Sequence, residues 1–557
     1  MSLVCVPIMV DDPAAALADA QSAKDAGADI VELRIDSYFD PSDEESEQSL
    51  RVEHIRGLIA DAPLPVILTC RSAAEGGDYE ADDLSRVELL EAILNDAEHP
   101  PAYLDFELAS YQPSPEIRGR IDACLGAASS QSEPRTRLIL SMHDFDQRPS
   151  DLMRRLAGAW AEPAASVVKF AYRCRSIRDN LEIFEILRDA PKPTIGLGMG
   201  EFGLMSRVLA PKFNGFLTFA SLRDSAATAP GQPTISDLLG MYRIRSITKD
   251  TRVYGVIGWP VTQSMSPLIH NAGFEARGWD GVYLPMPVPD SDEAFKATID
   301  VLADARRLLF AGASVTIPHK QRVFQSFPSL ITQMSNQAEE IGAGNTLQLE
   351  PIGEDLPAAA LVTNTDSEAV RQLLVELNED PPRCRVAVFG AGGVAKAVAY
   401  AGYALGAQVT VFGRNAERAA KFVQELQTLD RPWDSPAHPI FGDRIELGSL
   451  DSLAESRHHV YINCTPVGMT GGPDPEGLSI PVHDLAGKLP PETVFFDTVY
   501  NPIETPMLKA AREHGFRTID GVEMFVRQAA AQSELWTGEQ APMQLFDRLV
   551  RERLGGD

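Results

Sequence analysis

The sequence predicts an α/β protein in which an N-terminal (β/α)8 barrel of the TIM type is followed by two further α/β domains, the second with a Rossmann-type sheet. Three observations support this prediction. The chain has 557 residues, which is too long for one hydrophobic core. Its first half alternates short β-like runs with helix-like stretches, and residues 384–415 read as strand, glycine turn, helix and strand.

Eight runs rich in β-branched and aromatic residues occur in the first 222 residues, and helix-like stretches follow most of them. Strands that alternate with helices imply a parallel sheet. Eight such units in ~240 residues is the count of a (β/α)8 barrel. The runs are residues 3–10, 28–36, 65–71, 102–108, 137–145, 166–172, 194–200 and 215–221.

The composition narrows the classes of function. Hydrophobic residues make up 44% of the chain and charged residues 23%, which is typical of a globular protein. The net charge of -29 argues against nucleic acid or an anionic membrane as a partner, because clustered Lys and Arg bind phosphate groups. We therefore expect small-molecule substrates. The oligomeric state stays open, and a monomer is compatible with the sequence.

The cysteines and the first residues indicate a cytoplasmic protein. Six cysteines are scattered without a CxxC pair or zinc-ligand spacing, so we expect reduced thiols and no metal site. The segment MSLVCVPIMV lacks the basic and small-residue features of a signal peptide. No apolar stretch reaches membrane-spanning length.

Charged side chains stand in or at the end of four of the runs, although a parallel barrel strand has apolar neighbours on both faces. They are Glu32, Arg34, Arg71, His143 and Lys169. The carboxyl ends of barrel strands meet at one mouth, where barrel enzymes have their active sites. Unrelated ion pairs at strand ends are the alternative, but the convergence of five such groups favours a functional site.

Lys169 lies within the apolar run SVVKFAY, where desolvation favours the neutral amine. A neutral amine is a nucleophile toward carbonyl groups. His143, on the preceding run, is then placed to move protons to and from an imine. Together they predict imine-based elimination or aldol chemistry. Taken singly, such a lysine is more often a paired or snorkelling residue and such a histidine a satisfied core residue.

The motifs of the first half resemble those of the type I 3-dehydroquinate dehydratases. VELRID, TCRSAAEGG, SMHDF, VVKFA, the MSR of residues 205–207 and the APGQPT of residues 229–234 follow in the same order. The resemblance implies that Lys169 forms a Schiff base with the substrate ketone. It also implies that His143 removes the adjacent proton and then protonates the departing hydroxyl, with Glu75 orienting His143.

The same resemblance implies a set of substrate contacts. Arg207 holds the carboxylate, and the hydroxyls are bound by Glu32, Arg34, Arg71 and Gln232. Thr228 stands where the family usually has Ser, four residues before the glutamine. A hydroxyl is retained at this position, so we expect an active enzyme in which the loop that carries Thr228 closes differently over the substrate.

The second half begins after a polar connector. Residues 223–252 mix a polar loop, a short helix and a charged segment, and we place the boundary near Ser246–Asp250. We expect a barrel of residues 1–245, a substrate domain of residues 250–370 completed by residues 528–557, and a nucleotide-binding domain of residues 371–527.

A glycine turn at residues 390–393 predicts a dinucleotide site. Gly390, Gly392 and Gly393 follow the strand VAVF and open a helix, so a pyrophosphate can approach the backbone at the helix N-terminus. The next strand ends without the Asp or Glu typical of NAD-binding proteins. Arg414-Asn415 and Arg418 stand there instead, which favours the 2′-phosphate of NADP. A solvated basic loop is the alternative.

The motifs of the second half resemble those of the shikimate dehydrogenases. They are VIGWPVTQSMSPLIHN, GASVTIPHK, GAGNT, TNTD, NCTPVGM, DTVYNPIETP and DGVEMFVRQAAAQ. The resemblance implies that Lys320 and Asp366 relay the proton while hydride moves between nicotinamide and substrate. Substrate contacts are implied for Ser264, Ser266, Thr316, Asn345, Tyr500 and Gln528, and contacts on the cofactor side for Thr465, Met469 and Met524.

Ser314 stands where many bacterial members of that family have Asn, as in plant-type enzymes. We expect a change in affinity and not in reaction class. The two halves would then catalyse consecutive steps, from dehydroquinate through dehydroshikimate to shikimate. Two alternatives remain: a non-catalytic sensor of quinate or shikimate, and an NAD-dependent quinate dehydrogenase in the second half.

Overall fold

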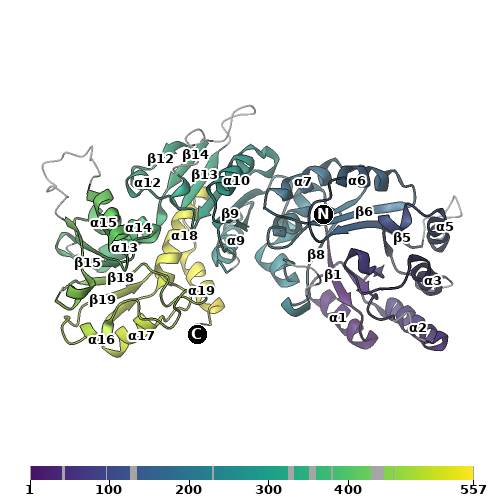
Figure 1. Ribbon diagram of the computed structural model, residues 1–557, viewed down its shortest axis with the longest axis horizontal. Coiled ribbons are helices and arrows are strands. Elements are labelled where there is room, and N and C mark those ends of the chain that lie inside the picture. Colours follow the sequence, from purple (N-terminus) through teal and green to yellow (C-terminus); the bar gives the residue numbers. More distant parts are fainter. Residues whose placement is uncertain are drawn as a thin grey trace. The chain divides into compact units, whose positions relative to one another are not determined.

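The computed structural model describes residues 2–39, 44–95, 97–125, 135–226, 228, 231–261, 263–323, 331–350, 359–377, 381–427, 444–455 and 457–555. The chain forms two compact units that divide between Thr251 and Arg252 (Figure 1). No helix in the described residues is both long enough and apolar enough to span a bilayer.

The first unit is an eight-stranded parallel barrel, as predicted. Neighbouring strands pair in the order β7-β6-β5-β4-β3-β2-β1-β8. The Phe216 amide donates to the Thr194 carbonyl over 2.9 Å, which joins the two ends of the sheet. The strands are β1 (Leu3–Met9), β2 (Ile30–Arg34), β3 (Val66–Thr69), β4 (Tyr103–Glu107), β5 (Arg137–Asp144), β6 (Ala165–Arg173), β7 (Thr194–Met199) and β8 (Leu217–Phe219).

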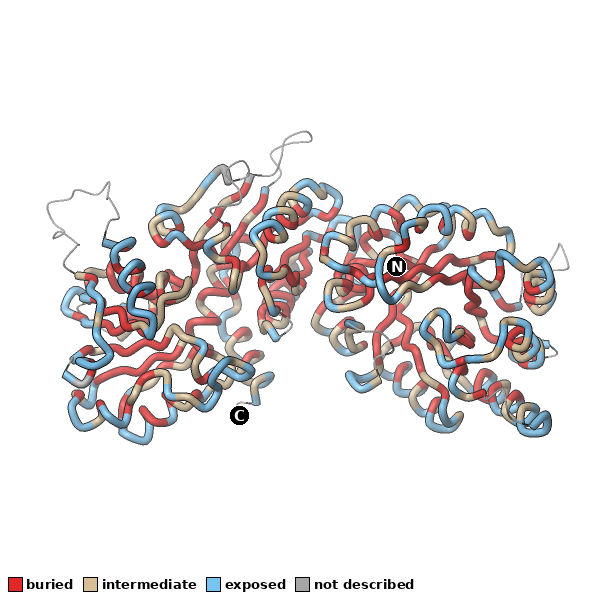
Figure 2. Tube along the Cα trace, in the orientation of Figure 1, coloured by how far each residue is buried: buried red, intermediate tan, exposed pale blue. Residues whose placement is uncertain are grey.

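Helices follow most barrel strands, and α1, α3 and α5 begin at side-chain caps. The Asp12 carboxylate accepts from the Ala15 amide and Pro13 opens α1, so both local signals set that start. Every strand contributes a buried apolar residue to one interior cluster. Figure 2 shows the barrel strands coloured mostly as buried. The helices are α1 (Pro13–Asp25), α2 (Glu45–Asp61), α3 (Asp83–Leu94), α4 (Leu108–Tyr111), α5 (Pro115–Cys124), α6 (Leu152–Ala161), α7 (Asp179–Asp189) and α8 (Leu204–Val208).

The second unit contains two sheets. The first is mixed, in the order β10-β9-β11-β13-β14-β12, because β13 runs antiparallel to both neighbours. Its strands are β9 (Arg252–Gly258), β10 (Gly281–Pro287), β11 (Phe310–Val315), β12 (Ile331–Met334), β13 (Thr346–Glu350) and β14 (Ala359–Thr363). Its helices are α9 (Ser266–Arg277), α10 (Asp292–Asp304) and α12 (Asn336–Ile341).

The second sheet is parallel and has the predicted Rossmann-type order, β17-β16-β15-β18-β19-β20. Its strands are β15 (Arg385–Phe389), β16 (Gln408–Phe412), β17 (Ile445–Leu447), β18 (Val460–Asn463), β19 (Val494–Asp497) and β20 (Arg517–Ile519). The helices here are α14 (Gly393–Ala404), α15 (Ala416–Gln427), α16 (Val482–Leu485) and α17 (Pro506–Glu513). The strand, glycine turn, helix and strand expected for residues 384–415 are therefore present.

Two long helices link these sheets: α13 (Thr365–Leu377) and α18 (Gly521–Thr537), which is followed by α19 (Met543–Arg553). Met524 of α18 is buried in the core of the parallel sheet. Farther along the same helix, Trp536 packs with Tyr254 and Tyr283 of the mixed sheet. The Arg527 guanidinium of α18 donates two 2.8 Å hydrogen bonds to Glu376 of α13. The two linking helices are therefore joined to each other.

Candidate active sites

Lys169 lies inside the barrel on β6 and is 5% exposed. Its Nζ atom is 3.2 Å from Glu32 Oε1 and 3.0 Å from Asp105 Oδ2. The expectation of a purely nonpolar setting is therefore wrong. Two carboxylates at hydrogen-bonding distance hold the amine in a fixed position on β6.

Asp105 is the centre of a buried polar cluster. Its Oδ1 atom accepts from Arg71 Nη2 at 2.8 Å and from Ser141 Oγ at 2.6 Å. Burial by itself raises the pKa of Asp105, but Arg71 and Lys169 outweigh burial and hold that pKa well below its usual range. Asp105 therefore stays ionised beside Lys169.

Asp105 and Glu107 were absent from the residues predicted for the site. Both lie on β4 and are 1% exposed, and the Glu107 carboxylate is 3.1 Å from the Arg71 guanidinium. A signal was present in the sequence, since the run of residues 102–108 carries two carboxylates on a strand with apolar neighbours. Like Glu32, Asp105 and Glu107 are charged side chains on a strand with apolar neighbours, which indicates a functional site.

His143, on β5, pairs with Glu75 as predicted. Glu75 belongs to a short 3-10 turn, Ala73–Glu75, after β3, and its Oε2 atom accepts from the His143 amide at 2.9 Å. The same oxygen lies 3.0 Å from His143 Nδ1. Burial raises the pKa of Glu75 to about 7. Burial, with the charges of Arg71 and Lys169, lowers the pKa of His143 well below its ordinary value. An Nδ1–H bond to Glu75 leaves Nε2 free to accept a proton.

Arg207, on α8, is 2% exposed. No ion pair is recorded for it within the described residues, and its Nε atom has no hydrogen-bond partner there. Burial lowers the pKa of Arg207 to about 10. A buried guanidinium without a carboxylate is costly, so this site is suited to an anionic ligand.

The remaining barrel residues have local partners. Arg34, at the end of β2, binds Asp36 through Nε and Nη2, each at 2.8 Å. The Thr228 amide donates to Gln232 Oε1 over 3.0 Å. Residues 229 and 230 of the APGQPT motif lie outside the described residues.

In the second unit, Lys320 Nζ lies 2.5 Å from Asp366 Oδ2. Lys320 follows the turn after β11, and its carbonyl accepts from the Gly344 amide at 2.8 Å. Asp366 is near the N-terminus of α13 and is 5% exposed. The predicted pair is thus formed by two segments that both approach the end of the mixed sheet.

A hydrogen-bonded network lies beside this pair. Asn345 is 1% exposed, and its Oδ1 atom accepts from the Thr365 amide at 2.8 Å. Gln532 of α18 donates to Thr346 Oγ1 at 3.0 Å and accepts from Ser314 Oγ at 2.8 Å. Gln532 was not among the predicted residues, although it lies one helical turn after the predicted Gln528.

Other predicted substrate contacts surround the start of α9. Ser266 is its first residue and is 5% exposed, and its amide lies 3.3 Å from Ser264 Oγ. Tyr500 is stacked on Phe525 of α18 with ring centroids 4.6 Å apart. Gln528 donates to the carbonyl of Phe525 in its own helix at 3.1 Å. Thr316 follows β11, and its amide donates to the Ile257 carbonyl over 2.9 Å.

The glycine turn fits a closely approaching dinucleotide. Gly390 has a φ of 128°, and a Cβ atom there would stand 2.9 Å from the Cys464 carbonyl oxygen. A Cβ atom on Gly393, which opens α14, would stand 3.5 Å from Lys320 Cδ. Gly392 is the N-cap of α14. The N-terminus of α14 therefore adjoins the predicted catalytic lysine.

The residues predicted to contact the cofactor differ in their exposure. Arg414, Asn415 and Arg418 follow β16 and are exposed, and Asn415 Oδ1 accepts from the Arg418 amide at 2.9 Å. Met469 is 37% exposed. Thr465 is partly buried, and its Oγ1 atom donates to Asn463 Oδ1 at 2.7 Å. Met524 is buried in the core, as described above.

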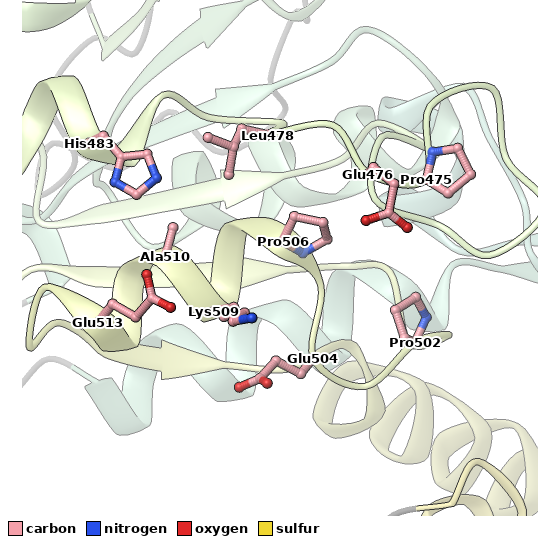
Figure 3. A pocket seen from close by; sticks show the side chains of 10 residues that line it. All are labelled: Pro475, Glu476, Leu478, His483, Pro502, Glu504, Pro506, Lys509, Ala510 and Glu513. Atoms are coloured by element: carbon pink, nitrogen blue, oxygen red, sulfur yellow. The ribbon is translucent and has the colours of Figure 1, made fainter.

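A surface cavity of about 460 Å³ lies elsewhere on the second unit (Figure 3). It contains none of the predicted site residues. Two of its polar groups are already engaged, since Glu504 pairs with Arg512 and His483 Nδ1 lies 2.9 Å from His514 Nε2. We assign it no catalytic role. Its lining comprises Pro475, Glu476, Leu478, His483, Pro502, Glu504, Pro506, Lys509, Ala510 and Glu513.

Family models match three stretches of the chain. Residues 4–249 match the type I 3-dehydroquinases, residues 256–347 the shikimate dehydrogenase substrate binding domain, and residues 521–551 the shikimate 5'-dehydrogenase C-terminal domain. The matches define the class: a dehydroquinase barrel joined to a shikimate dehydrogenase. Both predicted resemblances are confirmed.

Known proteins extend the match over the whole chain. The chloroplastic bifunctional 3-dehydroquinate dehydratase/shikimate dehydrogenase of Arabidopsis thaliana is 34% identical over 99% of this chain and 84% of that protein. The shikimate biosynthesis protein AroDE of Chlamydia pneumoniae is 28% identical over 91% and 90%. The shikimate dehydrogenase (NADP(+)) of Methanocella arvoryzae is 36% identical over 54% of this chain and 99% of that protein. The chain belongs to the family of bifunctional 3-dehydroquinate dehydratase/shikimate dehydrogenases.

Proposed function

We propose that this chain catalyses two consecutive steps of the shikimate pathway. The barrel dehydrates 3-dehydroquinate to 3-dehydroshikimate, and the second unit reduces that product to shikimate with NADPH. The observation that carries the proposal is the arrangement inside the barrel. Lys169 lies between two carboxylates, His143 is paired with Glu75, and the buried Arg207 has no ion pair within the part of the chain that the structure describes.

Dehydration follows from those groups. Arg207 binds the substrate carboxylate, and the Lys169 nitrogen, once deprotonated, attacks the ketone; loss of water leaves a protonated imine. The positive imine acidifies the neighbouring C–H bond, and His143 Nε2 removes that proton. His143 then gives the proton to the departing hydroxyl, and Glu75 stabilises the intervening imidazolium. Water hydrolyses the imine and restores Lys169.

Reduction uses the residues beside α14. Asn345 and the hydroxyls of Ser264, Ser266 and Thr316 hold the substrate, together with Tyr500 and Gln528. NADPH supplies the hydride when it is bound. Lys320 gives a proton to the substrate oxygen, and Asp366 keeps the lysine oriented through the 2.5 Å contact.

The cofactor preference rests on charge. Gly390, Gly392 and Gly393 let a pyrophosphate approach the N-terminus of α14. Arg414 and Arg418 are exposed after β16, where a 2′-phosphate needs cations and an NAD ribose needs a carboxylate. Thr465, Met469 and Met524 line the cofactor side in this proposal.

Three domains and a cytoplasmic location complete the proposal. Residues 1–245 form the dehydratase, residues 250–370 with 528–557 the substrate domain, and residues 371–527 the NADP domain. The second unit has a mixed sheet and a separate parallel sheet, which supports the division into a substrate domain and an NADP domain. All six cysteines are free thiols, which suits a reducing compartment.

Borohydride trapping tests the dehydratase. Sodium borohydride with dehydroquinate should add the reduced substrate to the intact chain at Lys169, as located by peptide mass spectrometry. The Lys169→Ala variant should form no adduct and lose dehydration. Lys192→Ala is the matched control. Lys192, which precedes β7, donates to the Glu162 and Ala165 carbonyls, and its replacement should leave the adduct unchanged. An adduct on another lysine would refute the assignment.

Separate assays test the dehydrogenase. The second unit should oxidise shikimate faster with NADP than with NAD, and it should oxidise shikimate faster than quinate. Rates with NAD and quinate that equal those with NADP and shikimate would instead establish a quinate dehydrogenase. Lys320→Ala should reduce oxidation at least about a hundredfold and leave dehydration intact. Lys296→Ala, an exposed position on α10, is the control. Loss of both activities in Lys320→Ala would contradict two independent sites.

A further inference from the structure

We propose that Asp36 is a positioning residue for dehydration, which fastens the substrate-binding Arg34 and the loop that carries Glu75 to one carboxylate. This inference rests on the proposed dehydratase function. It adds a residue that touches neither Lys169 nor His143 in the structure and that has no assigned role in the motif comparison.

Asp36 is fully buried and uses both of its oxygens. Oδ1 accepts from Arg34 Nε and Oδ2 from Arg34 Nη2, each at 2.8 Å. Such a two-point contact fixes the plane of a guanidinium as well as its position. Burial raises the pKa of Asp36 by itself, but the Arg34 contacts outweigh burial and lower it, so the carboxylate remains ionised.

The second contact of Asp36 reaches another segment. Its Oδ2 atom also accepts from the Asp78 amide at 3.0 Å, across 42 residues of sequence. Asp78 belongs to the loop of residues 71–79, which connects β3 to the chain before α3. Glu75 is three residues before Asp78 in this loop, and its carboxylate holds His143.

The loop is closed tightly enough to transmit a displacement. The Ser72 carbonyl accepts from the Gly77 amide at 3.0 Å, and the Tyr79 amide donates to the Arg71 carbonyl at 3.3 Å. A Cβ atom on Gly77 would stand 2.2 Å from the Arg71 carbonyl oxygen, so the two sides of the loop are in contact. A displacement of Asp78 after loss of its contact with Asp36 is therefore passed on to Glu75.

Two distinct kinetic effects follow. Loss of the Arg34 contact weakens substrate binding and raises KM. Loss of the Asp78 contact shifts Glu75 and His143 and lowers kcat, because small displacements of catalytic groups cost up to about a hundredfold in rate. A residue that acts through Arg34 alone would produce only the first effect.

The test uses Asp36→Asn in the full-length protein, alone and combined with Arg34→Gln. Asp36→Asn should lower kcat for dehydration about tenfold to a hundredfold and also raise KM. In the Arg34→Gln background, Asp36→Asn should lower kcat again. Glu91→Gln is the control, because it breaks another two-point pair, with Arg120, between α3 and α5. It should leave both constants unchanged.

Trapping with borohydride separates the possible failures. If the wild type forms no adduct at Lys169, the proposed function is wrong. If the wild type and Asp36→Asn both form the adduct, the variant barrel is folded and its kcat decides the inference. An unchanged kcat, or no further loss in the Arg34→Gln background, would overturn it. If Asp36→Asn does not fold, Asp78→Pro removes the amide that donates to Asp36 but keeps the Asp36–Arg34 pair, and it should lower kcat with little change in KM.

Discussion

The Nζ atom of Lys169 lies 3.0 Å from Asp105 Oδ2, and the other oxygen of Asp105 accepts from Arg71 at 2.8 Å. Asp105 thus lies between the proposed nucleophile and a proposed substrate-binding arginine. Its charge holds the lysine in place beside the arginine.

Asp105→Asn should slow dehydration about a hundredfold, because a neutral amide no longer holds Lys169 and leaves Arg71 with one carboxylate fewer. The rate of adduct formation with borohydride should fall in parallel, measured by quenched mass spectrometry. Shikimate oxidation by the second unit provides the control in the same chain. A variant that forms the adduct at the wild-type rate would show that Asp105 has no part in positioning Lys169.

The pH dependence of dehydration should follow Glu75. Burial raises the pKa of this carboxyl to about 7, so it is protonated below that pH and ionised above it. Because the ionised form stabilises the His143 imidazolium, kcat/KM should rise up to about pH 7 and then level off. The lowered pKa of His143 keeps the imidazole neutral over the same range.

In Glu75→Gln the rise of kcat/KM with pH should disappear, and the constant value at high pH should be lower than in the wild type. The measurement is kcat/KM from about pH 5 to about pH 9 for both proteins. If kcat/KM rises with pH in the variant as it does in the wild type, the titrating group is not Glu75.

Arg207→Met should stabilise the substrate-free barrel while it weakens substrate binding. The guanidinium is buried without a recorded carboxylate partner in the described residues, so its removal relieves the cost of burying an unpaired charge. KM for dehydroquinate should rise about a hundredfold through the loss of a charged contact. Thermal unfolding with and without substrate analogue tests both parts. A lower melting temperature would mean that Arg207 has a structural partner.

Arg414→Asp should convert the cofactor preference. The new carboxylate repels a 2′-phosphate and suits a ribose hydroxyl, so KM for NADPH should rise at least about tenfold and KM for NADH should not. Lys421→Asp, an exposed position on α15, makes the same charge change away from the turn after β16. Equal effects of the two variants would indicate long-range charge and not phosphate binding.

Much of the architecture could be predicted because its signals are local. Each barrel strand coincides with one of the eight expected runs, since apolar periodicity and the following helix are read from neighbouring residues. The glycine turn at Gly390 was likewise recognisable, because the strand before it and the helix after it are adjacent in sequence.

The setting of Lys169 was mispredicted for the opposite reason. Its nearest residues in sequence are apolar, but its partners Glu32 and Asp105 lie 137 and 64 residues away. Asp105 and Glu107 were overlooked inside an otherwise apolar run. Gln532 was overlooked because a glutamine on a helix is ordinary until the helix is known to cross a polar network.

The amino-acid order alone determined the two α/β units, the lysine and histidine of the barrel, the glycine turn and the arginines after it, because these depend on periodicity and short spacing. Only the tertiary structure decided which charges meet. Carboxylates surround Lys169, Arg207 is buried without an ion pair among the described residues, and Asp36 lies between Arg34 and the Glu75 loop. Electrostatic environment depends on distances between strands and loops, and the closed barrel sets those distances.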